Sequence, residues 1–418
     1  MFFLWSLPLL NHTSENPVGK LLSFSQSLGE GLGVVFFTLQ SHTPPHTLMD
    51  VTLLCEFGSL NGGEQSILAV LPFLRNHGIQ FQVFAPPQSP LTEAVAALGI
   101  ESVPFAVEEC SSLPERRERL TELLRWHPPM LLHANSLSMG RLAGPIAEML
   151  GIPSVAHLRD IIRLSAASVA DLNRHRMLLA VSEATRTFHV AQGIAADRCR
   201  VLSNGVDLRR FFPGPPTGFL HREFGIPPGA PLLGVIGQIG LRKGQDFLLD
   251  ALRPLFAKRN DVHLLIVGRR WSEKEESVLF EEHLRTVAGV EPYRNRIHFT
   301  GVRQDVPELL RELTLLVHPA KQEPLGRVLL EAAASGVCVV ASNVGGTAEV
   351  LTDCDSARLF ERGDTDMLCN TVATLLDSPD ERERMGIAAR KRIETAFSAE
   401  LCAERLLGIY KFVIRVGG

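Results

Sequence analysis

The chain has 418 residues, of which 45% are hydrophobic and 21% are charged, so we expect a globular protein of two domains. Its formal net charge of −4 argues against a nucleic-acid partner or a strongly acidic membrane surface. Seven cysteines are scattered without a CxxC pair, and several lie in apolar runs. This pattern predicts reduced thiols in a cytoplasmic protein rather than disulfides or a zinc site.

Residues 1–48 differ in composition from the rest of the chain. The opening MFFLWSLPLL is apolar, but it lacks a basic flank and contains Pro8, so it fits neither a signal peptide nor a membrane span of about 20 residues. We expect a poorly ordered leader, or a start codon set too far upstream with Met49 as the true start. Peripheral contact of residues 1–10 with the inner face of the membrane is the alternative.

Residues 49–212 alternate short apolar runs with helical patterns. The first strand, 51–56, leads through a Gly-rich turn into a helical pattern over 66–77. This βα repetition predicts a parallel sheet with helices on both faces, which binds ligands beyond the carboxyl ends of its strands. The later strands are expected at 80–84, 130–133, 155–157 and 178–181, and the helices between them at 90–98, 140–149 and 166–174.

Several polar residues and glycines follow these strands. His133, His157 and Ser182 each close a predicted strand, where a satisfied structural polar group is the simpler interpretation. Gly62 and Gly63 lie in the turn after the first strand, where a backbone without side chains can approach a ligand closely. A tight turn without a ligand explains the same glycines equally well.

A change of domain is predicted near residue 213. The stretch RVLSNGVDLRRFFP, 200–213, contains the turn dipeptide Asn204-Gly205, and residues 213–230 are dense in proline and glycine. We therefore expect a linker at 213–230 and a second domain over 231–398.

The second domain opens with a strand at 232–236 and the loop GQIGLRKG. Gly237 begins this loop, and Arg242 and Lys243 supply cations that can neutralise a diphosphate. A solvated basic turn is the alternative. After a strand at 263–268, the stretch RIHFTGVRQDV predicts another strand and a turn at 301–303.

Residues 315–350 form a strand-helix-strand unit. Its helix opens near Gly326, so Glu323 precedes the helix and Glu331 lies about a turn inside it. Both acids border the positive end of the helix, where unpaired N–H groups can hold a phosphate. Carboxylates suit the neutral hydroxyls of a sugar better than a phosphate. Taken alone, either acid is more simply a solvated charge at a helix end.

The unit as a whole resembles the signature of the retaining GT-B glycosyltransferases, the large group 1 family that includes glycogen and sucrose synthases. The matching residues are Glu323-Pro324-Leu325-Gly326, Glu331, and Gly345-Gly346 with Glu349. The resemblance implies an α/β fold of two Rossmann-like, doubly wound parallel-sheet domains that face a central cleft. It covers Val51 to the C-terminus, is strongest over 232–350, and implies that the last helix, 399–418, crosses back to the first domain.

The resemblance also implies roles for the donor side of the site. Glu323 would contact hydroxyls of the donor sugar, Glu331 the ribose, and the backbone of Leu325 and Gly326 the diphosphate. Lys243 would act with Glu323 in catalysis. In the loop that Gly237 opens, Gln238 stands where the family has an Arg, and Arg242 is the candidate that replaces this missing charge.

The remaining roles fall on the edges of the cleft. The family binds the nucleobase against the backbone of the turn at Gly301, Val302 and Arg303. In the family, a His at the position of His157 reaches the donor sugar, which implies a catalytic role for His157. Gly62 and Gly63 would face the cleft near donor and acceptor.

By resemblance, the protein is a retaining glycosyltransferase that needs no metal or cofactor. We expect a nucleotide-sugar donor and an acceptor that is a glycan, a lipid-linked sugar or a small molecule. The sequence contains no Asp-any-Asp motif at a strand end and no His/Glu cluster with ligand spacing. The alternatives are a nucleotide-sugar epimerase or hydrolase on the same fold, and a non-catalytic nucleotide-sugar-binding protein.

Overall fold

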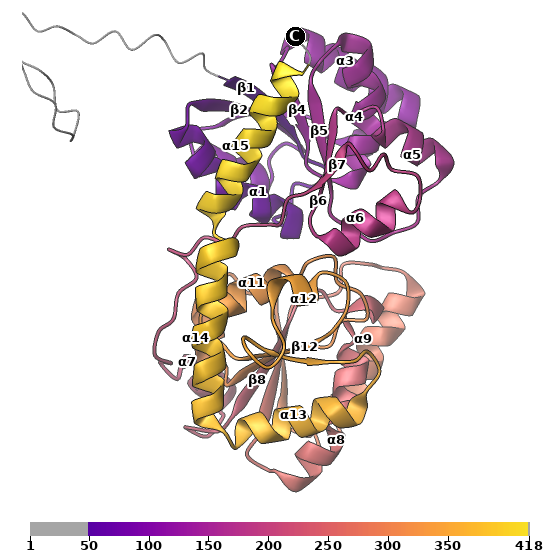
Figure 1. Ribbon diagram of the computed structural model, residues 1–418. Helices are drawn as coiled ribbons and strands as arrows, with labels where there is room; N and C mark the ends of the chain where they lie inside the picture. Colours follow the sequence, from indigo (N-terminus) through magenta and orange to yellow (C-terminus); the bar gives the residue numbers. More distant parts are fainter. Residues whose placement is uncertain (1–48, 417–418) are drawn as a thin grey trace, which may run out of the picture. The chain divides into compact units, whose positions relative to one another are not determined.

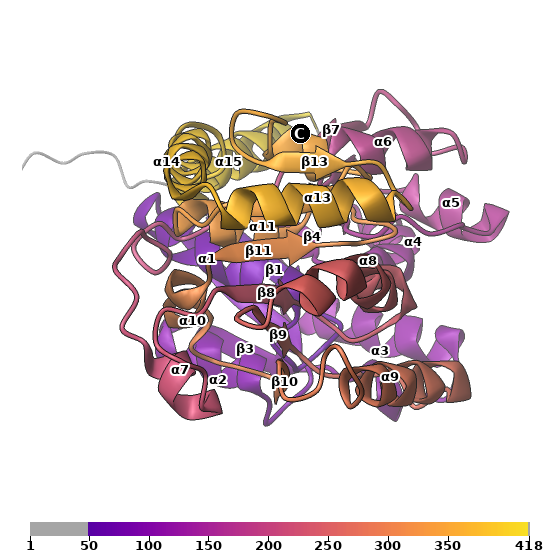
Figure 2. The same cartoon turned by 90° about the horizontal axis from the view of Figure 1, so that it is seen from below.

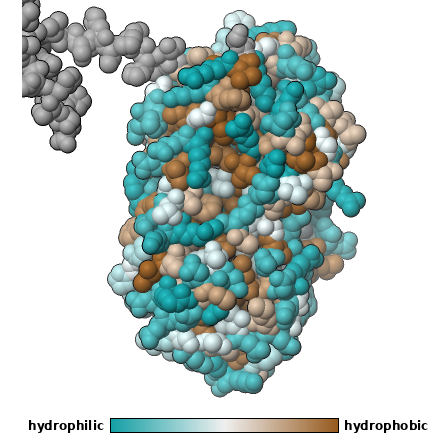
Figure 3. Space-filling model, viewed as in Figure 1, coloured by the Kyte–Doolittle hydropathy of each residue, from teal (hydrophilic) through white to brown (hydrophobic). Residues whose placement is uncertain are grey.

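The computed structural model describes residues 49–416 (Figure 1). The predictions for residues 1–48 and for the last two residues of the C-terminal helix lie outside the described residues. None of the helices over 49–416 combines the length and the apolar character needed to cross a membrane. The face shown in Figure 3 is mostly hydrophilic, with hydrophobic residues scattered across it.

The first domain is built on a seven-stranded sheet with the order β3-β2-β1-β4-β5-β6-β7, in which every pairing is parallel. Helices α1, α2 and the C-terminal α15 (Ala399–Arg415) pack on one face, and α3, α4 and α5 pack on the other. The strands are β1 (Met49–Leu54), β2 (Ile79–Ala85), β3 (Glu101–Pro104), β4 (Leu131–Ala134), β5 (Ser154–Leu158), β6 (Met177–Ala180) and β7 (Cys199–Val201). The helices are α1 (Gly62–Asn76), α2 (Pro90–Ala97), η1 (Val107–Glu109), α3 (Leu113–Trp126), α4 (Leu137–Leu150), α5 (Ala166–Leu172) and α6 (Glu183–Val190).

The second domain repeats this plan with six parallel strands in the order β10-β9-β8-β11-β12-β13. Figure 2 shows the strands between two helical layers, with α8, α9 and α13 on one face and α7, α10, α11 and α14 on the other. The strands are β8 (Leu232–Ile236), β9 (His263–Val267), β10 (Ile297–Gly301), β11 (Leu315–His318), β12 (Val339–Ser342) and β13 (Arg358–Phe360). The helices are α7 (Phe219–Phe224), η2 (Leu241–Lys243), α8 (Gln245–Lys258), α9 (Glu275–Ala288), α10 (Val306–Glu312), α11 (Arg327–Ala334), α12 (Thr347–Val350), α13 (Thr365–Leu376) and α14 (Pro379–Ala396).

The predicted fold class is confirmed: both domains are doubly wound parallel sheets. Parallel sheets covered on both faces need strands that are apolar throughout, and β11 and β12 are buried at every position. The strand order reverses direction between β1 and β4 and again between β8 and β11. Ligands bind at such switch points, beyond the carboxyl ends of the strands.

The last two helices serve different domains (Figure 1). Ala389 and Ile393 of α14 belong to the core of the second domain, whereas Leu406 and Tyr410 of α15 belong to the core of the first. The chain therefore returns to the first domain between α14 and α15. Two backbone hydrogen bonds hold this return point. The amide of Val206 donates to the carbonyl of Phe397, and the carbonyl of Val206 accepts from the amide of Ala399.

Some elements differ from the sequence predictions. Helix α1 begins at Gly62, so Gly62 and Gly63 occupy its first turn instead of the preceding loop. The first turn closes there because the amide of Gln65 donates to the carbonyl of Asn61. The segment 213–230, predicted as a linker, contains α7, whose Leu220 is buried in the core of the second domain.

Candidate functional site

A cleft of about 950 Å³ lies where loops of the two sheets meet. From the first domain, it is lined by residues that follow β1, β4 and β5. From the second, it is lined by residues that follow β8, β9, β10 and β11. The cleft therefore coincides with both switch points, where this architecture binds its ligands.

Most of the residues singled out from the sequence line this cleft. They are Gly62, Gly63, Gly237, Arg242, Lys243, Val302, Arg303, Glu323, Leu325, Gly326 and Glu331. The lining does not include His157 or Gly301.

Glu323 is the most tightly held acid of the site. Its Oε2 accepts from Lys243 Nζ at 2.6 Å and from His318 Nε2 at 2.8 Å, and the residue is only 6% exposed. Burial alone would raise the pKa of the carboxyl, but the charge of Lys243 and the hydrogen bond from His318 outweigh it and hold the pKa well below its usual range. Burial lowers the pKa of His318, so this imidazole donates to Glu323 as a neutral ring. Glu323 is therefore ionised at neutral pH.

The N-terminus of α11 opens into the same cleft. Gly326 is its N-cap, with φ of 92° and no side chain that caps the helix, and this left-handed conformation favours glycine. The first amides of α11 are thus left free of side-chain partners. Inside the helix, Glu331 Oε1 pairs with Arg327 Nη2 at 2.6 Å.

The Gly345-Gly346 pair supports the loop that carries Glu323. The amide of Gly346 donates to the carbonyl of Glu323 at 3.0 Å. Because the backbones lie so close, a Cβ on Gly345 would stand 1.9 Å from the same carbonyl oxygen. Gly345 also has a φ of 54°, which an L side chain adopts rarely. These glycines are needed for the shape of the site loop.

Contacts from the first domain reach this loop as well. Ser182 caps α6 and also donates through Oγ to the carbonyl of Pro324 at 2.5 Å. The carboxylate of Glu349 accepts from the amides of Glu183 and Ala184 at 2.8 and 2.9 Å. Ser182 and Glu349 thus join the two domains behind the cleft instead of facing it.

The cationic side of the cleft departs from the family pattern. Lys243 is engaged with Glu323, and Gln238 lies on the cleft with its backbone carbonyl bonded to Gln245 Nε2 at 3.0 Å. Arg242 reaches towards the first domain, where its Nη1 lies 3.5 Å from Asp160 Oδ1.

His157 does not line the cleft itself. It is 3% exposed, and its Nδ1 lies 2.7 Å from His133 Nε2, whose other nitrogen lies 2.5 Å from the hydroxyl of Tyr410. Burial, and next the charge of Arg159, hold the pKa of His157 well below its usual value. Both hydrogen bonds form when the Tyr410 hydroxyl donates to His133 Nδ1 and the Nε2–H of His133 donates to His157 Nδ1. Nδ1 of His157 is used inside the first domain and the residue does not line the cleft, so the expectation that His157 reaches the donor sugar stays a prediction.

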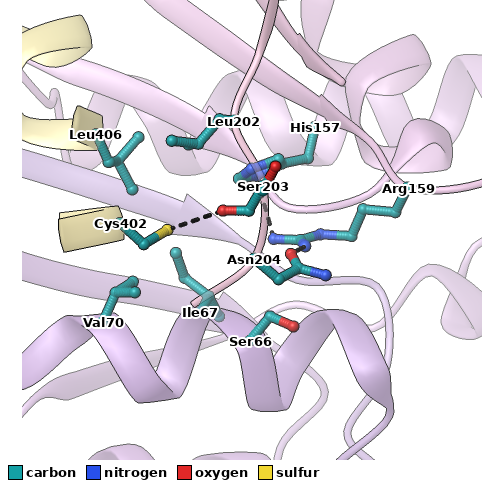
Figure 4. Close-up of a pocket in the computed structure, with 10 residues that line it drawn as sticks. All are labelled: Ser66, Ile67, Val70, His157, Arg159, Leu202, Ser203, Asn204, Cys402 and Leu406. Atoms are coloured by element: carbon teal, nitrogen blue, oxygen red, sulfur yellow. Dashed lines mark hydrogen bonds between the residues drawn. The ribbon is translucent and has the colours of Figure 1, made fainter. Parts of the chain in front are cut away.

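Unlike His157, Arg159 lines the cleft. It borders both the cleft and a small cavity of about 10 Å³ beside His157 (Figure 4). Its guanidinium donates to Asn204 Oδ1 at 2.7 Å and to Asn135 Oδ1 at 2.8 Å. Sequence reasoning missed Arg159 and Asn135, although both follow predicted strands.

The turn at 301–303 is partly engaged. The carbonyl of Gly301 accepts from the amide of Gly268 at 2.8 Å. The side chain of Arg303 is held by Asp305 and Glu223, whose hydrogen bonds raise its pKa above the usual value. Val302 is the exposed residue of this turn. Within residues 49–416, no three His, Cys, Asp or Glu side chains are grouped to hold a metal ion.

Two family models divide the chain between them. The model for glycosyl transferases group 1 matches residues 217–392, and that for glycosyltransferase family 4 matches residues 60–210. The alpha-maltose-1-phosphate synthase of Mycolicibacterium smegmatis is 30% identical over 320 residues, which are 68% of this chain and 79% of that protein. The GDP-mannose-dependent alpha-mannosyltransferase of Mycobacterium tuberculosis is 28% identical over 379 residues, 85% of this chain and 93% of that protein.

Solved structures show the same fold. HepE of Anabaena, crystallised in complex with UDP-glucose, has a TM-score of 0.76 at 21% identity, over 87% of this chain and 99% of that one. Sucrose-phosphate synthase of Thermosynechococcus elongatus has a TM-score of 0.71 at 18% identity, over 88% and 100%.

Two doubly wound domains with a shared cleft at their switch points define a GT-B fold, as the resemblance implied. With the match to the synthase of M. smegmatis, the chain belongs to the group 1 glycosyltransferase family. The chain spans between 55% and 63% of the length of four other curated relatives, among them a GDP-mannose-dependent mannosyltransferase of Corynebacterium glutamicum that is 33% identical over 219 residues.

Proposed function

We propose that this protein is a retaining, metal-independent glycosyltransferase that moves a sugar from a nucleotide-sugar donor to a glycan, a lipid-linked sugar or a small molecule. The observation that carries the proposal is the ionised Glu323 between Lys243 and His318, beside the free N-terminus of α11, in a cleft that both domains line. Relatives named for GDP-mannose and a structural neighbour crystallised with UDP-glucose support a nucleotide-sugar as the donor class.

The donor diphosphate fits the N-terminus of α11. Free amides and the positive end of the helix attract the phosphate oxygens, and Lys243 adds a full charge nearby. As the sugar leaves, negative charge grows on the diphosphate, and the same groups stabilise it without reorganising. These groups supply the neutralisation that a metal ion would otherwise give.

The two acids have separate tasks in this proposal. Glu323 is ionised and buried, so it accepts hydrogen bonds from hydroxyls of the donor sugar and fixes the orientation of the ring. Glu331 lies further inside α11 and accepts from the ribose, while Arg327 balances its charge. The acceptor would approach from the loops that follow β1 and β4. Attack on the same face as the departing diphosphate, with retention, is inferred from the family.

The site of action in this proposal is the cytoplasm, with peripheral membrane contact if the acceptor is lipid-linked. All seven cysteines lie among the described residues and are free thiols, which supports a reducing compartment.

Donor turnover in the presence of EDTA tests the chemistry. The purified protein is incubated with UDP-glucose, GDP-mannose or ADP-glucose and with a panel of glycan, lipid-linked and small-molecule acceptors. Release of the nucleotide is measured, and the anomeric configuration of the new glycosidic bond is identified by NMR. We expect turnover of one donor despite EDTA, with the donor's own configuration in the first product. The variant Glu323→Gln should lower kcat/KM by about 10- to 140-fold, because hydrogen bonds to a charged group contribute about 1.5–3 kcal/mol.

Glu394→Gln is the matched control, because Glu394 pairs with Arg390 on the surface of α14. Inversion of configuration, or turnover only after a divalent metal is added, would contradict the proposed mechanism. Release of free sugar at the rate of transfer would favour a hydrolase, and binding without turnover would favour a non-catalytic protein.

A further inference from the structure

The loop after β9 places an aromatic side chain on the cleft. Trp271 is 48% exposed, and the guanidinium carbon of Arg269 lies 3.7 Å from the centroid of its ring. Both side chains line the cleft. A tryptophan is among the residues that gain most from burial, so a half-exposed indole in a cleft leaves apolar surface for a ligand to cover.

Arg269 has no acidic partner among the described residues. Its neighbour Arg270 pairs with Glu273 at 3.1 Å and Glu281 at 3.3 Å, whereas no carboxylate over 49–416 lies within ion-pair distance of Arg269. Its guanidinium instead covers one face of Trp271, an arrangement that the ring quadrupole favours. The pair thus combines an oriented indole with an uncompensated positive charge.

The position of the pair in the sheet indicates which part of a donor it meets. The amide of Gly268 donates to the carbonyl of Gly301, so the loop of Arg269 and Trp271 lies beside the turn at 301–303. In the order β10-β9-β8-β11, β9 is separated from β11 by one strand. Strands lie about 4.8 Å apart, so the pair is about 10 Å across the sheet from the strand that leads to Glu323 and α11. The same cleft is lined by the start of α11 and by this pair, so a donor with its diphosphate at α11 can extend its nucleoside in this direction.

We propose that Trp271, oriented by Arg269, is the stacking surface for the nucleobase of the donor. This inference rests on the proposed function, because it assumes that a nucleoside diphosphate occupies the cleft. Stacking of a base on an aromatic side chain tolerates any base, so Trp271 sets affinity while the backbone of the turn at 301–303 contacts the base edge. Replacing Trp271 by Ala should weaken nucleotide binding by about 5- to 140-fold, which corresponds to about 1–3 kcal/mol at 1.4 kcal/mol per tenfold.

Calorimetric titration of the full chain with UDP, GDP, ADP and inorganic pyrophosphate tests the assignment. Wild type is compared with Trp271→Ala and Trp271→Phe. Trp126→Phe is the control, because Trp126 is 82% exposed on α3 in the first domain and outside the cleft. We expect weaker nucleotide binding in Trp271→Ala, nearly full recovery in Trp271→Phe, and the wild-type value in Trp126→Phe.

Pyrophosphate separates base stacking from a general effect on the loop, since it has no base. Its affinity should be the same in Trp271→Ala and in the wild type. Equal nucleotide affinity in these two proteins would overturn the inference and leave the proposed function intact. Equal weakening of nucleotide and pyrophosphate binding would also overturn it, because the variant would then act on the whole site. A folded wild type that binds none of the nucleotides would contradict the proposed function, and the inference with it.

Discussion

The ion pair between Lys243 and Glu323 sets the charge at the centre of the cleft. Both side chains are largely buried, so Lys243→Met leaves an ionised carboxylate without its cation. We expect this variant to lose about 3–5 kcal/mol of unfolding free energy, as measured by urea denaturation. The double variant Lys243→Met/Glu323→Gln should lose less than the sum of the two single variants. Strictly additive losses would show that the two groups do not interact.

Single residues also show where sequence reasoning succeeded and where it ended. Lys243, Glu323 and Glu331 follow strands in strand-loop-helix patterns, and the resemblance to the group 1 family singled them out as site residues. All three line the cleft, while their roles stay predictions. His157 also follows a strand, but its position depends on Tyr410, which contacts His133 across 277 residues of sequence. No local pattern reveals a contact of that range.

The loop that supports Glu323 depends on the turn before α12. Gly346 has an ordinary φ of −82°, but a Cβ there would stand 2.4 Å from the carbonyl oxygen of Pro324 and 2.9 Å from the Cα of Leu325. Gly346→Ala should therefore destabilise the fold by about 1–3 kcal/mol and weaken donor binding, as measured by urea denaturation and calorimetry. Gly408→Ala on α15 is the control, since its Cβ meets nothing within 4 Å and the change should stabilise the helix by up to about 1 kcal/mol. Equal behaviour of the two variants would contradict this account of the turn.

The attachment of α15 to the first domain includes a buried hydrogen bond. Tyr410 is fully buried, and its hydroxyl is the partner of His133 Nδ1. Tyr410→Phe keeps the ring but leaves that nitrogen unpaired, which should lower the free energy of unfolding by about 1–3 kcal/mol in a urea titration. A change below about 0.5 kcal/mol would mean that the bond does not stabilise the helix.

Elements were predicted where the apolar pattern is strong. Most strands of the two sheets were anticipated within a few residues, because parallel strands buried on both faces form short apolar runs that charged segments interrupt. The edge strands β3 and β7 of the first sheet were not predicted, since each has a single buried residue. Helix α3 was missed: half of the residues in its sequence, LPERRERLTELLRW, are charged, and Leu120 and Leu124 are its buried residues. Helix α14 was missed for the same reason. Of its eighteen residues, four are buried: Met385, Gly386, Ala389 and Ile393. Such helices gain their stability from packing that the local pattern shows only weakly.

At the scale of the whole molecule, buried neutral histidines predict sensitivity to acid. Burial, and next the charge of Arg159, lower the pKa of His133 to about 3, and burial lowers that of His175 to about 4. An unfolded histidine titrates near pH 6.5, so the unfolded chain takes up these protons first and stability falls as the pH drops below that value. For His175 the loss at pH 5 is about 2 kcal/mol relative to neutral pH.

Unfolding free energies measured between pH 7.5 and 4.5 check this expectation. His175→Asn should be less stable at neutral pH, because His175 bonds Ser154 and the carbonyl of Gly140, but it should lose less stability on acidification. An identical slope in wild type and variant would show that His175 does not titrate between the two states.

The central claim, that the cleft binds a nucleotide-sugar through Glu323, Glu331 and α11, is tested most directly by stabilisation with donors. Thermal unfolding of the wild type, Glu331→Ala and the surface control Glu394→Ala is followed with a panel of UDP-, GDP- and ADP-sugars. A ligand at a hundred times its Kd adds about 2.7 kcal/mol. We predict that one donor class stabilises the wild type and the control and that Glu331→Ala loses the effect. No response to any donor in folded wild-type protein would contradict the claim.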